Sequence, residues 1–164
     1  MNRRNNYMMQ NKITKEIKLK DTKDECRRCN NMEKVLLFSD EQKIFEVTNK
    51  VLNEEYEFVW CTYDWLNENR YTKADIVIMH FDEQMTKEGT FWQIVKVKGR
   101  LGHSIPILAI IEGGTPQDIY AALKAGAYDY LETVENVREY KKKIKDIFLW
   151  SWYIKKYGLG GGLV

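Results

Sequence analysis

A histidine stands where an apolar run of the sequence ends. The run IVIM at 76–79 is followed by His80, and the acids Asp82 and Glu83 come soon after it. Such a run is typical of a buried strand. Because ligands of open parallel sheets bind at the carboxyl ends of the strands, the role of His80 decides between a chemical and a purely binding function.

Ser39 and Asp40 stand at a second position of this kind, directly after the apolar run KVLLF. Imidazole and carboxylate groups suit Zn²⁺ and similar ions, so His80, Asp40 and Asp82 form a candidate metal site. A structural zinc site usually has four ligands, and the sequence offers no obvious fourth. We therefore expect no metal here, and a neutral His80 imidazole that hydrogen-bonds to Asp40 or Asp82.

Cys26 and Cys29 have the spacing of a zinc half-site. No second pair exists, because the third cysteine, Cys61, stands alone in an apolar run. Zinc shared between two copies of the chain is one interpretation, and two reduced cysteines in a flexible tail are the one we expect. The glycines of EGG at 112–114 lack the rest of a phosphate-loop pattern, which predicts a simple turn.

Five apolar runs predict the strands that position these residues, at 34–38, 57–61, 75–79, 105–111 and 127–131. Helices are predicted between and after them: one after a Ser39–Gln42 capping box, one from Thr62, one at 90–98, one from Thr115 to Gly126, and one from about Val134 to Tyr157. The strands are continuously apolar, as strands buried on both faces are. Alternation with helices then predicts a parallel sheet with helices on both faces.

Composition excludes several classes of protein. The chain has 164 residues, of which 44% are hydrophobic and 30% charged, a globular profile. Residues 1–33 carry a net charge of +4 and residues 34–164 a net charge of −2. The larger part therefore lacks the basic excess of a nucleic-acid-binding domain. No run is long enough to span a bilayer, and the polar N-terminus is unlike a signal peptide, so we expect a cytoplasmic protein without membrane contact.

Four blocks of the sequence resemble those of a response-regulator receiver domain: VLLFSDE, ADIVIMHFDEQM, SIPILAII and LKAGAYDYLETV. The resemblance covers residues 34–148 and implies an α/β, flavodoxin-like (CheY-like) three-layer sandwich with a parallel sheet of order 2-1-3-4-5. It leaves a basic polar extension at 1–33, expected to be flexible, and an aromatic helix end with a glycine-rich tail at 149–164.

The resemblance also implies where the phosphorylation chemistry of the family would lie. The family uses an acidic pair for Mg²⁺, an aspartate acceptor, a Thr or Ser, a Lys, and a switch aromatic. The matching positions here are Ser39-Asp40, His80, Ile111, Thr133 and Tyr130, and Tyr130 alone fits. Phosphoryl transfer depends on positioning and charge neutralisation, and Mg²⁺ prefers several oxygen ligands. The resemblance therefore implies a vestigial pocket in a pseudo-receiver, with no enzymatic activity and no Mg²⁺.

The last predicted helix carries a possible binding surface. Its apolar stripe for the sheet comprises Val137, Tyr140, Ile144, Ile147 and Ile154, and its end adds Phe148, Leu149, Trp150, Trp152 and Tyr153. A helix apolar on all sides must be covered, and Trp and Tyr are common at interface hot spots. We expect a protein partner or a second copy to bind Phe148, Trp150, Trp152 and Tyr153 together with the fifth strand.

Two other functions stay open at this point. One is an active receiver that is phosphorylated or metal-bound through Asp40, His80 and Asp82, with Asp82 as a substitute acceptor. The other is a nucleic-acid regulator that acts through the basic N-terminal tail. The missing Lys and Thr disfavour the first, and the small charge excess disfavours the second.

Overall fold

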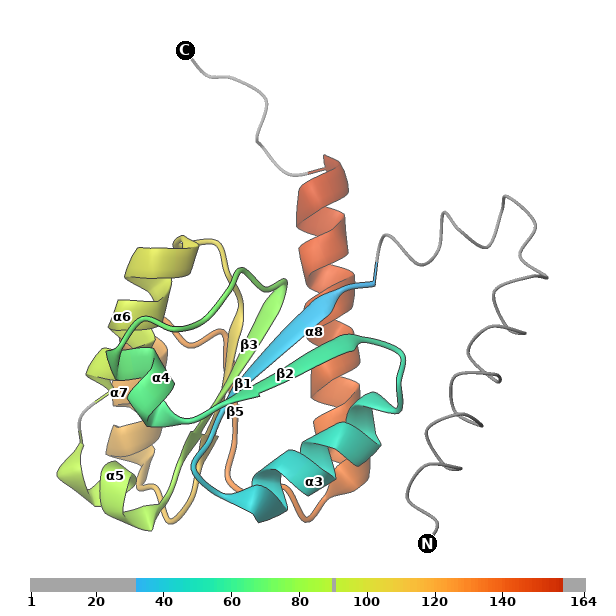
Figure 1. The fold of residues 1–164 in the computed structure, drawn as a ribbon. Coiled ribbons are helices and arrows are strands. Elements are labelled where there is room, and N and C mark those ends of the chain that lie inside the picture. The colour runs from blue at the N-terminus through green and yellow to red at the C-terminus, as the bar shows by residue number, and fades with distance from the viewer. Residues whose placement is uncertain (1–31, 90, 158–164) are drawn as a thin grey trace, which may run out of the picture. The chain divides into compact units, whose positions relative to one another are not determined.

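A parallel sheet forms the centre of the computed structural model, which describes residues 32–89 and 91–157 (Figure 1). Its strands are β1 (Lys34–Phe38), β2 (Glu57–Cys61), β3 (Ile76–Phe81), β4 (Ile107–Ile111) and β5 (Asp129–Leu131). Their order is β2-β1-β3-β4-β5, and every neighbouring pair is parallel. The predicted sheet is thereby confirmed. The predictions for the extension up to residue 31, with Cys26 and Cys29, and for the tail from residue 158 lie outside the described residues.

The helices of the described residues lie between and after the strands. They are α3 (Gln42–Leu52), α4 (Tyr63–Asn67), α5 (Glu83–Glu88), α6 (Trp92–Leu101), α7 (Pro116–Ala125) and α8 (Val137–Tyr157). Two of them, α5 and α6, lie between β3 and β4. α5 was not predicted. Its N-cap is Asp82, whose side chain accepts a hydrogen bond from the backbone N–H of Met85. None of these helices is both long and apolar enough to cross a bilayer.

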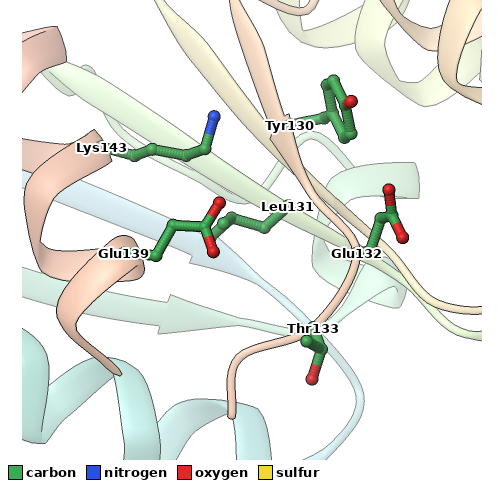
Figure 2. Close-up of a pocket in the computed structure, with 6 residues that line it drawn as sticks. All are labelled: Tyr130, Leu131, Glu132, Thr133, Glu139 and Lys143. Carbon is green, nitrogen blue, oxygen red and sulfur yellow. The ribbon is translucent and has the colours of Figure 1, made fainter. Parts of the chain in front are cut away.

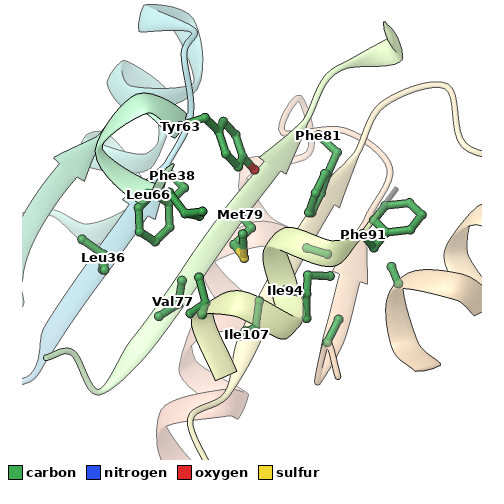
Figure 3. Packing of buried hydrophobic residues seen from close by; sticks show 14 of the residues in the cluster. Leu36, Phe38, Tyr63, Leu66, Val77, Met79, Phe81, Phe91, Ile94 and Ile107 are labelled. Atoms are coloured by element: carbon green, nitrogen blue, oxygen red, sulfur yellow. The ribbon is translucent and has the colours of Figure 1, made fainter. Parts of the chain in front are cut away.

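Successive side chains of each strand point to opposite faces of the sheet, and a helix layer covers each face. Leu36, Phe38 and Val77 pack with the residues of α4 and α6, as Figure 3 shows, and α7 lies on the same side. Val35 and Leu37, on the opposite face, pack with the residues of α3 and α8. The result is the expected three-layer sandwich.

The predicted ends of α7 are confirmed by its capping. Thr115 is the N-cap and forms a reciprocal capping box with Asp118, and Pro116 follows at the first helical position. Gly126 ends the helix with φ of 119°, which a residue with a side chain rarely adopts. The capping box predicted for Ser39 and Gln42 is wrong. The N-cap of α3 is Glu41, because the Ser39 hydroxyl binds inside the site described below.

The buried stripe of α8 differs in part from the predicted one. Tyr140, Ile144 and Ile147 are buried as expected. Val137 and Ile154 are exposed, and Phe148 and Ser151 are buried instead. The buried residues, at 140, 144, 147, 148 and 151, follow the 3.6-residue period of a helix, so one face of α8 packs on the sheet. Residue 154 is exposed because it lies in the last turns of α8, which extend beyond the sheet (Figure 1).

Candidate functional site

His80 lies inside β3 rather than after it, and only 2% of its surface is exposed. Phe38 of β1 pairs with Met79 of β3, so the next residues, Ser39 and His80, are neighbours across the two strands. The alternation of side chains puts both on the face covered by α3 and α8. There the Nδ1 atom of His80 lies 3.0 Å from Oγ of Ser39.

The other ring nitrogen of His80 faces a carboxylate. Nε2 lies 3.4 Å from Oε1 of Glu112, close enough for an ion pair, yet this buried atom has no hydrogen bond of acceptable geometry. Glu112 stands two residues beyond Ile110, the partner of His80 across β3 and β4, and therefore points to the same face. A carboxylate oxygen of Glu41 completes a cluster whose ligand atoms all lie within 4.8 Å of one another. We call Glu41, His80 and Glu112 the histidine–glutamate cluster.

The two aspartates expected beside His80 bind elsewhere. Oδ1 of Asp40 accepts a hydrogen bond of 3.0 Å from the backbone N–H of Tyr63, and Oδ1 of Asp82 caps α5. Asp40 lies beyond the end of β1, and this bond directs its carboxylate towards α4, whose residues pack on the face of the sheet opposite to His80. The predicted hydrogen bond of His80 to Asp40 or Asp82 is therefore wrong, and the structure pairs His80 with Ser39 and Glu112.

Two aromatic side chains that the sequence did not indicate hold the backbone of this site. The hydroxyl of Tyr63 donates a hydrogen bond of 2.7 Å to the carbonyl oxygen of His80, and Nε1 of Trp60 donates one of 2.7 Å to the carbonyl oxygen of Ser39. Burial raises the pKa of the Tyr63 phenol well above its usual range, and the charges of Asp40 and Asp82 act in the same direction. Tyr63 therefore remains a donor throughout the physiological pH range.

Ile111 and Thr133 occupy the positions at which the family resemblance places a hydroxyl and a lysine. Ile111 is fully buried on the face opposite to His80, with its Cγ2 atom so close to Gly114 that an added Cβ there would lie 2.7 Å away. Thr133 is exposed, and its hydroxyl accepts a hydrogen bond of 3.2 Å from the backbone N–H of Glu135. Neither side chain carries a positive charge.

Tyr130, the predicted switch aromatic, is half-buried beside a hollow of about 320 Å³ (Figure 2). The other lining residues are Leu131, Glu132, Thr133, Glu139 and Lys143. The Nζ atom of Lys143 lies 2.7 Å from Oδ2 of Asp129 and 5.6 Å from the centre of the Tyr130 ring. Lys143 is thus already paired, and is not a free substitute for a lysine at residue 133.

Three of the four residues of the predicted interaction surface on α8 are exposed. Trp150, Trp152 and Tyr153 are exposed, and 47% of the surface of Trp152 is accessible. Phe148 is buried at 6% exposure and stacks on Tyr56 with ring centres 4.4 Å apart, so it belongs to the core. The tyrosine of the β5 region beside Trp150 is Tyr128, at 4.8 Å between ring centres, rather than Tyr130.

The exposed aromatic residues lie at the end of the sheet opposite to His80. α8 starts after β5 and runs back past the sheet (Figure 1), so its last turns are near the amino ends of the strands. Lys155 accordingly pairs with Asp75, directly before β3. We call Trp150, Trp152 and Tyr153 the α8 aromatic surface.

Comparison with known proteins identifies the fold. No family model matches the chain, and no curated protein sequence matches it significantly. A response regulator from Thermotoga maritima is 18% identical over 73% of this chain and 99% of its own, with a TM-score of 0.56. A CheY-like protein from Pseudomonas aeruginosa PAO1 is 17% identical over 70% and 98% of the two chains, with a TM-score of 0.57.

A third similar structure is NtrX from Brucella abortus, with a TM-score of 0.63 and 16% identity over 77% of this chain and 29% of its own. At such low sequence identities, the similarity of these structures shows a shared fold. The CheY-like, flavodoxin-like fold that the sequence blocks implied is therefore confirmed for this chain.

Proposed function

We propose that this chain is a receiver-like module of signal transduction that regulates a partner through protein–protein contact, without phosphorylation of an acceptor side chain. The observation that carries the proposal is the state of the acceptor position. His80 stands there, almost fully buried, with Nδ1 held by Ser39 and Nε2 directed at Glu112.

The surroundings of His80 oppose transfer of a phosphoryl group to it. An incoming phosphoryl group is negatively charged, and the Glu112 carboxylate lies 3.4 Å from the only ring nitrogen that is not held by Ser39. Phosphoryl transfer is catalysed mainly by positioning and by cations that neutralise the developing charge. Lys143, a cation that lines the same hollow as Thr133, already pairs with Asp129.

The two aspartates of the region are also poorly suited as substitute acceptors. Oδ1 of Asp40 is bound to the backbone of Tyr63, and Oδ1 of Asp82 is bound to the backbone of Met85. Phosphorylation of either would place a bulky dianion on a group that holds the start of a short helix. These contacts favour a structural role for both carboxylates.

The proposed binding site for the partner is the α8 aromatic surface. Large aromatic side chains bury much area with few rotatable bonds, so ordering them at an interface costs little. The lysines Lys155 and Lys156 border this surface, and Lys156 lies 4.6 Å from the centre of the Trp152 ring. An apolar centre with a charged rim is the usual composition of an interface.

Intact-mass measurement after incubation with acetyl phosphate and Mg²⁺ tests the proposal. We expect no gain of a phosphoryl group, while a receiver with an intact acceptor site, treated in parallel, gains one. A stable gain in this chain that disappears in Asp40→Asn, Asp82→Asn or His80→Asn would identify an acceptor and refute the proposal. The two Asp→Asn changes keep side-chain size, and circular dichroism of all three variants shows whether each is folded, so that loss of the label would not merely report unfolding.

A further inference from the structure

We propose that the histidine–glutamate cluster binds a divalent transition-metal ion of the Zn²⁺ type. Its ligands would be Nε2 of His80 and one carboxylate oxygen each of Glu41 and Glu112. Ser39 and Asp40, which match the acidic pair of receiver domains, would not be ligands. This inference does not depend on the proposed regulatory function, because it concerns only what these three side chains can hold.

The spacing of the two best-placed ligand atoms fits a shared ion. Nε2 of His80 and Oε1 of Glu112 are 3.4 Å apart, and the buried nitrogen has no hydrogen-bond partner. A zinc ion bound tetrahedrally at its usual distances from nitrogen and oxygen separates such ligands by about 3.4 Å. The contact is long for a hydrogen bond and has the length expected for two ligands of one ion.

The imidazole is held in the orientation that a metal ligand requires. In proteins, a histidine that binds a metal through one nitrogen commonly donates the proton of the other to a neighbouring acceptor. Oγ of Ser39 lies 3.0 Å from Nδ1 and can accept this proton, since its own hydrogen can go to the carbonyl oxygen of Glu41, 3.5 Å away. In that arrangement the lone pair of Nε2 faces Glu112.

The two glutamates supply negative charge for the ion and connect the cluster to solvent. The side chain of Glu112 is 33% exposed, whereas that of His80 is 2% exposed, so solvent reaches the cluster at Glu112. The backbone N–H of Glu41 is bound to the Ser39 hydroxyl at 3.1 Å, which fixes its main chain beside the cluster. Two carboxylates within 4.8 Å of each other repel, and a divalent cation between them removes this repulsion.

The types of ligand select the class of ion. Mg²⁺ prefers oxygen ligands and near-octahedral geometry, whereas an imidazole nitrogen with carboxylates suits Zn²⁺ and neighbouring first-row ions. Three protein ligands leave room for a water molecule or a group from outside as the fourth. We therefore expect Zn²⁺ to bind and Mg²⁺ to compete poorly for the same site.

Titration calorimetry with zinc chloride tests this inference on the full chain carrying Cys26→Ser and Cys29→Ser, which removes the thiols as competing ligands. We expect one ion to bind per chain. Glu112→Gln and His80→Asn should each weaken binding more than about tenfold, and Ser39→Ala should weaken it by roughly 10- to 100-fold through loss of ring orientation. Zn²⁺ should also raise the unfolding temperature of the parent and not that of Glu112→Gln.

Asp40→Asn and Asp82→Asn are the matched controls. Each removes one negative charge from the same end of the sheet and keeps an oxygen for the hydrogen bond that the aspartate accepts. We expect both to bind Zn²⁺ as the parent does. Absence of binding by the parent, or equal affinity of the parent, Glu112→Gln and His80→Asn, would refute the site. Neither result would bear on phosphorylation, which the acetyl phosphate experiment measures separately.

Discussion

The hydroxyl of Tyr140 in α8 lies 2.7 Å from Oγ1 of Thr48 in α3, and both side chains are fully buried. This hydrogen bond joins the two helices that cover one face of the sheet. Burial raises the pKa of the Tyr140 phenol far above its usual value, although the bond to Thr48 acts in the opposite direction. The phenol therefore stays protonated, and the link between the helices persists at any ordinary pH.

Removal of the Tyr140 hydroxyl should destabilise the fold. We expect Tyr140→Phe to lower the free energy of unfolding by about 1–3 kcal/mol, because it leaves a buried Thr48 hydroxyl without its partner. Urea unfolding followed by circular dichroism measures this. In the double variant Thr48→Val/Tyr140→Phe, the loss should be smaller than the sum of the two single losses. Strict additivity would show that the bond contributes nothing to stability.

Phe148 and Trp152 should differ sharply in their effect on stability, although they are four residues apart on one helix. Phe148→Ala removes a buried ring that stacks on Tyr56, and we expect a loss of about 3–5 kcal/mol in the free energy of unfolding. Trp152→Ala removes an exposed ring, and the change should stay within about 0.5 kcal/mol. Thermal and urea unfolding of both variants would decide this, and a large loss for Trp152→Ala would place that ring in the core.

Association through the α8 aromatic surface should depend on Trp152. If the chain self-associates or captures a partner there, Trp152→Ala should weaken binding by about 2 kcal/mol, as loss of an interface anchor does. Trp92→Ala is the matched control, because Trp92 in α6 is exposed to almost the same extent, 48% against 47%. Sedimentation velocity over a range of concentrations measures self-association. Equal weakening by both substitutions would argue against a specific surface on α8.

The pairing of Asp75 with Lys155 should make stability depend on pH in the acid range. Partial burial raises the pKa of Asp75. Hydrogen bonds from Lys155 and from the Lys34 backbone, together with the charge of Lys155, lower this pKa by more, so it lies below its usual value. A carboxyl with a lowered folded-state pKa stabilises the fold above its unfolded pKa of about 3.9, and this contribution is lost as pH falls through the folded value.

Asp75→Asn should therefore be less stable than the parent at pH 7, and the difference should shrink as the pH falls below about 4. Urea unfolding at a series of pH values measures the two free energies. Lys155→Gln should reduce the same dependence, since it removes the charge and one strong hydrogen-bond donor. A difference between Asp75→Asn and the parent that is constant with pH would contradict this assignment.

The sequence was sufficient to predict the sheet, because its signal is local. Runs such as KVLLF and the Thr115–Gly126 capping pattern identify strands and helices from neighbouring residues alone. α5 was missed because it has only six residues and buries only Thr86, so it has no apolar periodicity to detect. The predicted fifth strand starts at residue 127, two residues before β5, because apolar residues continue in front of it while the N–H of Ala127 still bonds to the carbonyl oxygen of Ala122 in α7.

The partners of His80 could not be read from neighbouring residues. They depend on the register between β1 and β3, in which Phe38 pairs with Met79, and on the face to which each side chain points. Asp40 and Asp82 also follow predicted strands closely in sequence, yet each bonds to the start of a helix. Strand alternation applied to the predicted sheet order would have put Ser39 and Glu112, rather than the aspartates, beside the ring.

Because α8 continues beyond the sheet, the direction in which Trp152 and Tyr153 point is set by the rotation of the helix alone. The buried contacts of the helix end at Ser151, and the next six residues continue it to Tyr157. Trp152 and Tyr153 therefore point where the helical phase of the buried part sends them, at about 100° per residue. One residue inserted after Ser151 would turn the aromatic rings by about 100° around the axis without disturbing the core, whereas an insertion of four residues would nearly restore their direction and move them outward by about 6 Å.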